Sequence, residues 1–378
     1  MNILARCTLS LSISATAVVL AGCGGSQTLV GAPGAMAQTP GGASALTASH
    51  LDAASASYKV LYRFRRAAHP IAALINVNGT LYSTTYGAID GLGGGGYGTV
   101  YSITTSGAHK LLYRFRGGAD GHNPHGLVNV NGTLYGTTTF GGGYECNDSS
   151  GVGCGTVYSI STSGTEKALY AFKGSSDGAF PRAGLIDVNG TLYGTTSEGG
   201  SGCNSSGEEI GCGTVFSITA SGQETVLYRF AGFPDGIYPA ASLIDVNGTL
   251  YGTTIEGGSG CYSSHGLSGC GTVFAVTTSG RETVLHRFGS GDGVNPVGGL
   301  IDVNGTLYGT TSEGGTYYDG TVYSISTSDG ETVLYSFGGE PANGAVPEAP
   351  LLNVSGTLYG TAIYGGRNGH GTVFALTP

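Results

Sequence analysis

The chain has 378 residues, with 72 glycines, 23 tyrosines and no tryptophan, and only 10% of its residues are charged. The glycines follow no three-residue period, which excludes a collagen-like rod. The formal charge is −9, and the 15 basic residues are scattered, which excludes the basic stripe that a nucleic-acid binder needs. Glycine beside Asn, Ser, Thr and Asp between short apolar segments is typical of many short strands joined by tight turns.

The first 57 residues predict an export signal followed by a flexible tether. Leu9 to Leu20 form an apolar run too short to anchor stably in a bilayer, and it ends in Leu20-Ala21-Gly22-Cys23. This ending resembles the lipobox of bacterial lipoproteins, which implies cleavage before Cys23 and lipidation of that cysteine. Gly24 stands where the inner-membrane retention signal would have Asp. The resemblance therefore implies a protein anchored by lipid alone in the outer membrane or at the cell surface, and an ordinary secretory signal is the alternative.

Three segments are predicted from this pattern. They are a signal peptide at 1–22, the lipidated Cys23 with a disordered tether at 23–57, and a folded repeat domain at 58–378.

Six copies of one unit fill the repeat domain. Each copy has four apolar segments of about four to six residues, rich in Val, Ile, Tyr, Phe and Thr, which predict strands. In one copy the segments are Leu185–Val188, Thr191–Thr196, Gly213–Ile218 and Thr225–Phe230. Asn-Gly separates the first two segments and Ser-Gly turns join the last two, as expected for tight hairpins. Each unit is therefore predicted to be a four-stranded antiparallel meander.

The strands are apolar on both faces, which suits sheets stacked face to face around a ring. The fourth-segment aromatic residue recurs every 49 to 58 residues, close to the unit length of β-propellers. Val60–Phe64 is a fourth segment with no unit before it, and the last unit ends at its third segment, Gly371–Leu376. Pairing of these two would close an all-β, six-bladed β-propeller of four-stranded antiparallel blades and remove two open edges. An open six-unit solenoid is the alternative.

The repeated motifs resemble a known family. Asn-Gly-Thr-Leu-Tyr-Gly-Thr-Thr, then Gly-Gly, Gly-Thr-Val-Phe-Ser-Ile, Leu-Tyr-Arg-Phe, and Asp-Gly with a later Pro, are similar to the GloVer tandem repeat of exported bacterial proteins. The motifs are more distantly kelch-like, but they lack the kelch tryptophan. The resemblance implies an exported, surface-tethered repeat protein and no particular reaction.

Any binding site is expected at one end of the sheets, where the loops after the second and fourth strands are long and differ between copies. We name this end the long-loop face, because variable loops on a rigid scaffold carry function. Its candidate ligand-binding residues are Glu198, Glu256, Glu313, Asp120, Asp177, Asp235, Asp292, Tyr144, Tyr262, Tyr317 and Tyr318. The acidic residues could bind Ca²⁺ or a cationic ligand. The alternative, which their repetition favours, is a structural role in turns, with each Asp capping its own backbone.

Three cysteine pairs lie on the same loop of three consecutive units: Cys146 and Cys154, Cys203 and Cys212, and Cys261 and Cys270. Their spacing does not match the short knuckles of zinc sites, so no metal is expected. In an exported protein such pairs predict disulfides.

No catalytic pattern stands out in the repeat domain. There is no nucleophile elbow, and the histidines are scattered over several units. We therefore expect no catalytic residues and no cofactor, in a monomeric scaffold that binds a protein or glycan at the cell surface. The alternative function is a secreted polysaccharide hydrolase or lyase with acidic residues on the long-loop face. A purely structural surface-layer role is a third possibility.

Overall fold

The computed structural model describes residues 59–64, 68–86, 96–143, 146, 152–201, 203, 211–258, 269–326, 330–338 and 343–378. The chain divides into two units, Met1–Tyr58 and Lys59–Pro378, and the described residues all belong to the second. The signal peptide, the tether and four predicted site residues lie outside the described residues: Cys23, Tyr144, Cys261 and Tyr262. Within the described ranges, no helix has the length and apolar character needed to cross a bilayer.

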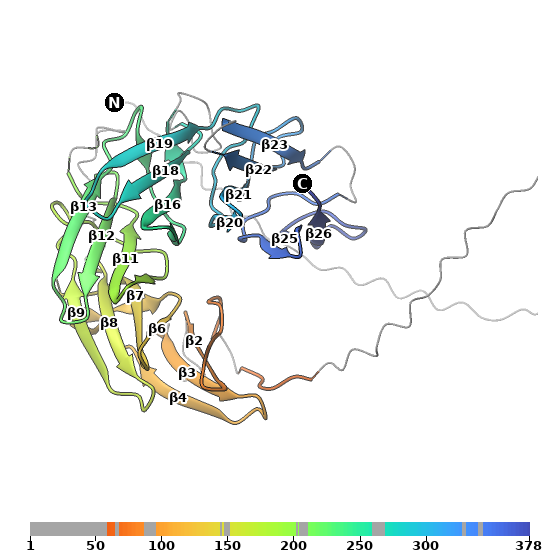
Figure 1. The fold of residues 1–378 in the computed structure, drawn as a ribbon. Coiled ribbons are helices and arrows are strands. Elements are labelled where there is room, and N and C mark those ends of the chain that lie inside the picture. Colours follow the sequence, from red (N-terminus) through yellow and green to blue (C-terminus); the bar gives the residue numbers. More distant parts are fainter. Residues whose placement is uncertain are drawn as a thin grey trace, which may run out of the picture. The chain divides into compact units, whose positions relative to one another are not determined.

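Antiparallel sheets account for almost all regular structure in the described residues, and Figure 1 shows them following one another along the chain. The first sheet contains β1 (Ile75–Val77), β2 (Thr80–Thr85), β3 (Thr99–Thr104) and β4 (His109–Arg114). The second contains β5 (His122–Pro124), β6 (Val128–Val130), β7 (Thr133–Phe140), β8 (Thr156–Ser161) and β9 (Glu166–Ala171). The third contains β10 (Ile186–Val188), β11 (Thr191–Thr196), β12 (Thr214–Thr219) and β13 (Glu224–Arg229).

The later sheets repeat this order. The fourth contains β15 (Ile244–Val246), β16 (Thr249–Thr254), β18 (Thr272–Thr277) and β19 (Glu282–Arg287). The fifth contains β20 (Ile301–Val303), β21 (Thr306–Thr311), β22 (Thr321–Ser326) and β23 (Gly330–Ser336). The sixth contains β24 (Leu352–Val354), β25 (Thr357–Ala362) and β26 (Thr372–Leu376), while the short strands β14 (Gly236–Ile237) and β17 (Glu256–Gly257) pair with each other. The prediction of an all-β chain built from four-stranded antiparallel meanders is confirmed.

The Asn-Gly hairpins form as the sequence predicts. Asn189 and Gly190 both have positive φ, at 53° and 85°, which is the backbone of a two-residue turn that matches the strand twist. The side chain of Asp187 accepts a hydrogen bond from the Gly190 N–H at 2.9 Å. The turn fixes the register of β10 and β11, with Ile186 opposite Tyr193.

Consecutive sheets pack through one repeated aromatic contact. The Phe that follows the fourth strand of one sheet meets, edge to face, an aromatic ring on the third strand of the next sheet. Phe172 and Phe216 show the pattern, with ring centroids 5.1 Å apart and both side chains fully buried. Burial of each such ring contributes about 2–3 kcal/mol, so this contact stabilises the packing of neighbouring sheets. The first strand of each sheet also contacts the first strand of the next.

The two ends of the repeat domain differ from the predicted closure. The last sheet has three strands, and Val373 on its edge strand β26 is 79% exposed. Val60–Phe64 packs instead against the first sheet, where the Tyr62 ring stacks on His109 at 3.9 Å between centroids. Among the described strand pairs, none joins Val60–Phe64 to β26.

Candidate ligand-binding site

A cavity of about 230 Å³ opens on the long-loop face between the third and fourth sheets. Its walls are Arg182, Ser197, Glu198, Tyr238, Ala240, Ile255 and Glu256. They combine a guanidinium, two carboxylates, a phenol ring and apolar side chains. Pockets for drug-sized ligands span about 300–1,000 Å³, so this volume suits one small ring or side chain of a ligand.

The loop before each Pro of the repeat positions these walls. Phe180 and Tyr238 both precede a Pro, and both have positive φ, at 55° and 59°. Main-chain hydrogen bonds hold this unusual backbone: the Tyr238 N–H donates to Cys212 O, and Tyr238 O accepts from the Ile255 N–H, both at 3.1 Å. The residues on either side of Pro are thereby directed to the end of the second strand of the sheet.

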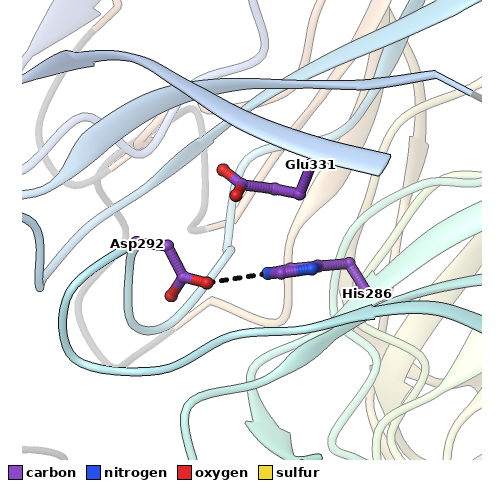
Figure 2. A group of neighbouring side chains, drawn as sticks. All are labelled: His286, Asp292 and Glu331. Carbon is purple, nitrogen blue, oxygen red and sulfur yellow. Dashed lines mark hydrogen bonds and ion pairs between the residues drawn. The ribbon is translucent and has the colours of Figure 1, made fainter. Parts of the chain in front are cut away.

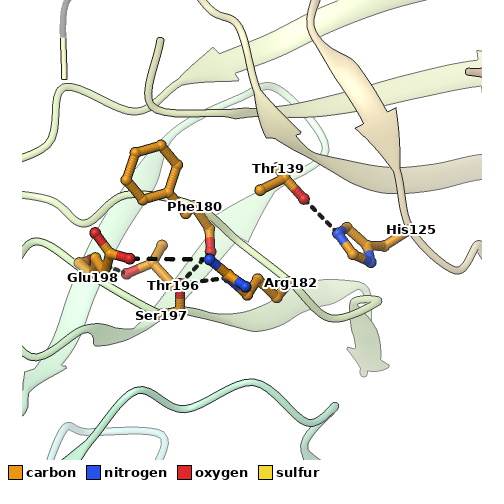
Figure 3. A network of polar contacts seen from close by, with 7 residues as sticks. All are labelled: His125, Thr139, Phe180, Arg182, Thr196, Ser197 and Glu198. Atoms are coloured by element: carbon orange, nitrogen blue, oxygen red, sulfur yellow. Dashed lines mark hydrogen bonds and ion pairs between the residues drawn. The ribbon is translucent and has the colours of Figure 1, made fainter. Parts of the chain in front are cut away.

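Arg182 is the centre of a polar network, which Figure 3 shows. Its Nε donates to Ser197 Oγ at 3.2 Å, and its terminal nitrogen lies 4.0 Å from Glu198 Oε1. Ser197 Oγ in turn donates to Phe180 O at 2.9 Å. The Arg182 side chain is 52% exposed and that of Glu198 is 17% exposed. The guanidinium is therefore oriented by the protein and still reachable from solvent.

His125 occupies the position after Pro in the preceding unit, and its Nε2 lies 2.6 Å from Thr139 Oγ1 (Figure 3). Burial, together with the positive charge of Arg182, lowers the pKa of His125 to about 4. The imidazole is therefore neutral near pH 7, so at that pH it cannot offer a positive charge to a ligand or act as an imidazolium acid.

The three predicted glutamates do not lie together in the structure. Glu198 and Glu256 line the cavity. Glu313 belongs to the fifth sheet, where its Oε1 accepts a hydrogen bond from Asn295 Nδ2 at 3.2 Å. Tyr317 and Tyr318 lie in the loop between β21 and β22, are 53% and 73% exposed, and do not line the cavity.

The predicted aspartates form a second, separate set between sheets. Asp177 accepts hydrogen bonds from the Tyr170 hydroxyl at 2.5 Å and from the Lys173 N–H at 3.0 Å. Three further Asp residues accept equivalent bonds from Tyr or His and from the main chain: Asp120, Asp235 and Asp292. These contacts favour the turn role over a ring of calcium ligands.

A glutamate from the next sheet completes each of these clusters. Burial first, and then the neighbouring aspartate, raise the pKa values of Glu166, Glu224 and Glu282 to about 7. Sequence reasoning missed these residues, because only the packing of sheets brings the start of one fourth strand over the loop of the preceding sheet. It also missed Tyr238, which precedes Pro, and Arg182, which follows it, although the residue after Pro differs in every copy and could have marked Arg182.

Two of the predicted disulfides are present in the described residues. They join Cys146 to Cys154 and Cys203 to Cys212. Cys270 is also disulfide-bonded, and its predicted partner Cys261 lies outside the described residues. The bonded sulfur atoms of the first two disulfides lie close to Gly174 and Gly232, in the loops that follow β9 and β13.

Fold and site together define an all-β tandem-repeat protein with a small polar cavity. The chain belongs to the family described as the Gloeobacter/Verrucomicrobia repeat, which matches residues 34–264 and 259–378. The resemblance to the GloVer repeat is thereby confirmed. Disulfides persist mainly in oxidising compartments, so together with this family they indicate an extracellular protein.

Several solved structures match this chain at low sequence identity. A computationally designed protein, Ika8, is 15% identical, with 81% of this chain and 70% of that chain covered and a TM-score of 0.45. The PQQ-bound aldose sugar dehydrogenase of Streptomyces coelicolor is 12% identical, with 83% and 96% covered and a TM-score of 0.45. XC5397 from Xanthomonas campestris, described as a gluconolactonase, is 14% identical, with 74% and 79% covered and a TM-score of 0.38. Among proteins of curated function, none matches this chain in sequence.

Proposed function

We propose that this protein is a non-enzymatic scaffold that binds a glycan through the cavity between its third and fourth sheets. The observation that carries the proposal is the presence of Arg182 and Tyr238 in one cavity. Both side chains stand at positions that change from copy to copy, whereas the surrounding backbone repeats. The repeated backbone does not itself require a guanidinium and an aromatic ring at these positions. We therefore attribute their presence in one cavity to ligand binding.

The chemistry of the walls fits a neutral sugar ring. Sugar hydroxyls both donate and accept hydrogen bonds, and the cavity offers a donor in Arg182 and acceptors in Glu198 and Glu256. The ring of Tyr238 supplies an apolar surface of the kind on which sugar rings pack. Because the cavity holds one cationic and two anionic side chains, it disfavours a polyanionic ligand.

Glycan binding can be tested with Arg182→Ala. Hydrogen bonds to charged groups are worth about 1.5–3 kcal/mol, so the dissociation constant for the best ligand on a glycan array should rise at least about tenfold. Calorimetry on the purified protein would measure it. Arg229→Ala is the matched control, because Arg229 lies in the same sheet and bonds to Ser176 O away from the cavity. Equal affinities for the wild type and Arg182→Ala would refute the site.

A polysaccharide hydrolase or lyase is the second candidate, because Glu198 and Glu256 face one cavity. Glycoside hydrolysis commonly uses two carboxylates that flank the sugar. Incubation of the bound glycan with wild type, Glu198→Gln and Glu256→Gln distinguishes the candidates. Cleavage by the wild type that either substitution removes would favour the enzyme, and an intact glycan would favour the scaffold.

We also propose that the protein is a monomer, anchored by lipid on Cys23 to the outer membrane or cell surface. A labelled fatty acid supplied to producing cells should be incorporated into the wild type and not into Cys23→Ser. The Cys23→Ser variant should also leave the membrane fraction. Equal labelling of both proteins would contradict the anchor.

We further infer that the sheets form a six-bladed propeller, with Val60–Phe64 as the missing fourth strand of the last blade. From the first sheet to the third, each fourth strand lies against a turn glycine of the next sheet. A Cβ added at Gly164 would lie 2.7 Å from Leu112 O of β4, and one added at Gly107 would lie 2.8 Å from Leu61 O. Val60–Phe64 thus already holds, against the first sheet, the position of a fourth strand from a preceding sheet.

The unpaired edge of β26, at the other end of the repeat domain, supports the same inference. A cavity of about 330 Å³ runs along β26, with Tyr335 and Phe337 of the fifth sheet among its walls. By analogy with the pair of Ser217 and Thr225, closure would set Ala375 opposite Lys59. Burying the exposed Val373 would add about 1.5–3 kcal/mol, and pairing the free edge would remove an aggregation hazard.

Disulfide cross-linking tests the closure. Lys59→Cys with Ala375→Cys should cross-link on oxidation, as should the positive control Ser102→Cys with Lys110→Cys, which are paired within the first sheet. Lys59→Cys with Ala275→Cys, the equivalent position of the fourth sheet, should not. Mass spectrometry of the digested protein identifies the linked peptides. Formation of the positive control without the Lys59–Ala375 link would refute closure.

A further inference from the structure

The clusters between sheets recur with one exception. In three of them a Tyr of the fourth strand, the Asp of the following loop and a Glu of the next sheet come together. The members are Tyr113, Asp120 and Glu166; Tyr170, Asp177 and Glu224; and Tyr228, Asp235 and Glu282. In the cluster between the fourth and fifth sheets, His286 replaces the Tyr, beside Asp292 and Glu331.

The replacement changes what the cluster can bind. Burial, followed by the neighbouring carboxylates, raises the pKa of each tyrosine well above its ordinary value, so the phenol stays protonated and cannot act as a metal ligand. A neutral imidazole, in contrast, is among the commonest metal ligands in proteins. The exceptional cluster therefore has three potential ligand groups where each of its sisters has two.

The side chains of these three residues are directed toward one another, as Figure 2 shows. His286 Nε2 lies 3.0 Å from Asp292 Oδ2, and one ligand atom from each of the three residues lies within 4.8 Å of the others. The imidazole is oriented by its edge-to-face contact with Phe288, whose ring centroid is 4.7 Å away. His286 and Asp292 are only 20% and 28% exposed.

A second observation concerns Glu331. Its Oε1 is buried and has no hydrogen-bond partner among the described residues, as is also true of the sister glutamates. A buried carboxylate oxygen without a partner is costly, because its desolvation is not compensated. In the sister clusters the tyrosine hydroxyl is hydrogen-bonded to the equivalent glutamate, and His286 makes no such bond to Glu331. At the exceptional cluster a bound cation would satisfy Glu331 and Asp292 together.

We propose that His286, Asp292 and Glu331 bind one divalent transition-metal ion of the zinc type. One imidazole nitrogen and two carboxylate oxygens are ligands that Zn²⁺ accepts, with water in the remaining position. Bonds of about 2 Å need ligand atoms about 3.5 Å apart, and rotation of the Glu331 side chain provides this closing movement. Because His286 comes from β19 and Glu331 from β23, the ion cross-links the fourth and fifth sheets, far in sequence from the proposed glycan cavity.

Calorimetric titration of the full, disulfide-bonded chain with ZnCl₂, after removal of metal with EDTA, tests the proposal. His286→Tyr restores the side chain of the sister clusters, so it should fold normally and bind one ion fewer than the wild type. Tyr228→His places an imidazole in the neighbouring cluster and should add one ion. Other histidines and the leader cysteines are identical in all three proteins and cancel from the comparison.

The metal should also raise the thermal midpoint of the wild type and not that of His286→Tyr, because it binds the folded state alone. Affinity at this site should fall at least about tenfold in His286→Tyr, as for the loss of groups that support a metal. Zinc stoichiometry and affinity that are identical in wild type and His286→Tyr would overturn the proposal, as would a wild type that binds no zinc. If His286→Tyr has an altered circular dichroism spectrum, Glu331→Gln takes its place in the titration. The same loss of one bound zinc ion is expected.

Discussion

Replacing the three buried glutamates between sheets by glutamine should stabilise the protein at high pH and have little effect at low pH. Glu166, Glu224 and Glu282 have pKa values raised from 4.5 to about 7, chiefly by burial and then by Asp120, Asp177 and Asp235. The folded state therefore holds protons that the unfolded chain releases. Their contribution to stability is fully present below pH 4.5 and is lost as the pH rises through 7.

The magnitude follows from the size of these changes. At full strength, a rise from 4.5 to about 7 would correspond to about 3 kcal/mol for each carboxyl. The side chains are only half-buried, and Arg229, Lys173 and Arg287 offset part of the effect, so solvent screening reduces it to roughly 1 kcal/mol each. The three clusters share no residues and should add to about 3 kcal/mol, or roughly 5 °C in the midpoint.

The assay is thermal unfolding of wild type and Glu166→Gln/Glu224→Gln/Glu282→Gln at pH 5, 6.5 and 8. Burial lowers the pKa values of His109, His122 and His125, and these groups change stability in the opposite direction as the pH falls. The informative quantity is therefore the difference between the two proteins at each pH, in which the histidines cancel. The variant's advantage should be smallest at pH 5 and should grow to its full value by pH 8. Glu348→Gln, an exposed site, should show no such trend, and a difference that is flat or shrinks with pH would refute the reasoning.

Three further sets of substitutions test the packing. Tyr158→Phe and Tyr323→Phe should each raise the free energy of unfolding by about 1 kcal/mol, because both hydroxyls are buried without a partner and the third and fourth sheets have Phe there. Chemical denaturation would measure it, and a clear loss would reveal a hidden partner. Gly194→Ala should cost about 2 kcal/mol, because its Cβ would lie 2.8 Å from Phe216 Cζ and from Leu185 Cδ2, whereas Gly291→Ala meets nothing within 4 Å and should be neutral. Cys203→Ser with Cys212→Ser should cost about 2.5 kcal/mol in the same assay, and an unchanged midpoint would show that the loop is not constrained by its disulfide.

The repeat made the strands predictable because local rules determine them. Asn189-Gly190 requires positive φ at both residues, and the flanking β-branched and aromatic residues are strand formers, so hairpin and register follow from nearby residues alone. The disulfides followed from spacing and compartment in the same way. Each of these features depends on residues within one unit.

The site depended on contacts between units, which sequence patterns do not encode. The Asp-Gly pairs were visible as turns, but no local rule places Glu224 over Asp177, 47 positions earlier. The Tyr-to-His change at His286 was visible as a departure from the repeat, but its meaning needed Glu331 of the following sheet. Pairing of Val60–Phe64 with the third segment of the last unit was predicted by counting strands. Among the described residues, the segment packs against the first sheet and does not pair with β26.

The residues that precede the repeated Pro show how this scaffold separates structure from recognition. All six have positive φ, although their side chains differ widely: His69, Asn123, Phe180, Tyr238, Asn295 and Val346. Such a backbone is strained for a β-branched residue such as Val346, so it persists only because neighbouring main-chain groups impose it. Val346 N–H donates to Asp319 O at 2.9 Å and Val346 O accepts from Ile363 N–H at 3.1 Å, the same bonding that Tyr238 has with Cys212 and Ile255. Because the same main-chain bonds hold this backbone in both copies, it accommodates side chains as different as Val346 and Tyr238. The repeat can therefore present a different side chain between each pair of sheets, and the glycan site that we propose would use Tyr238 in this way.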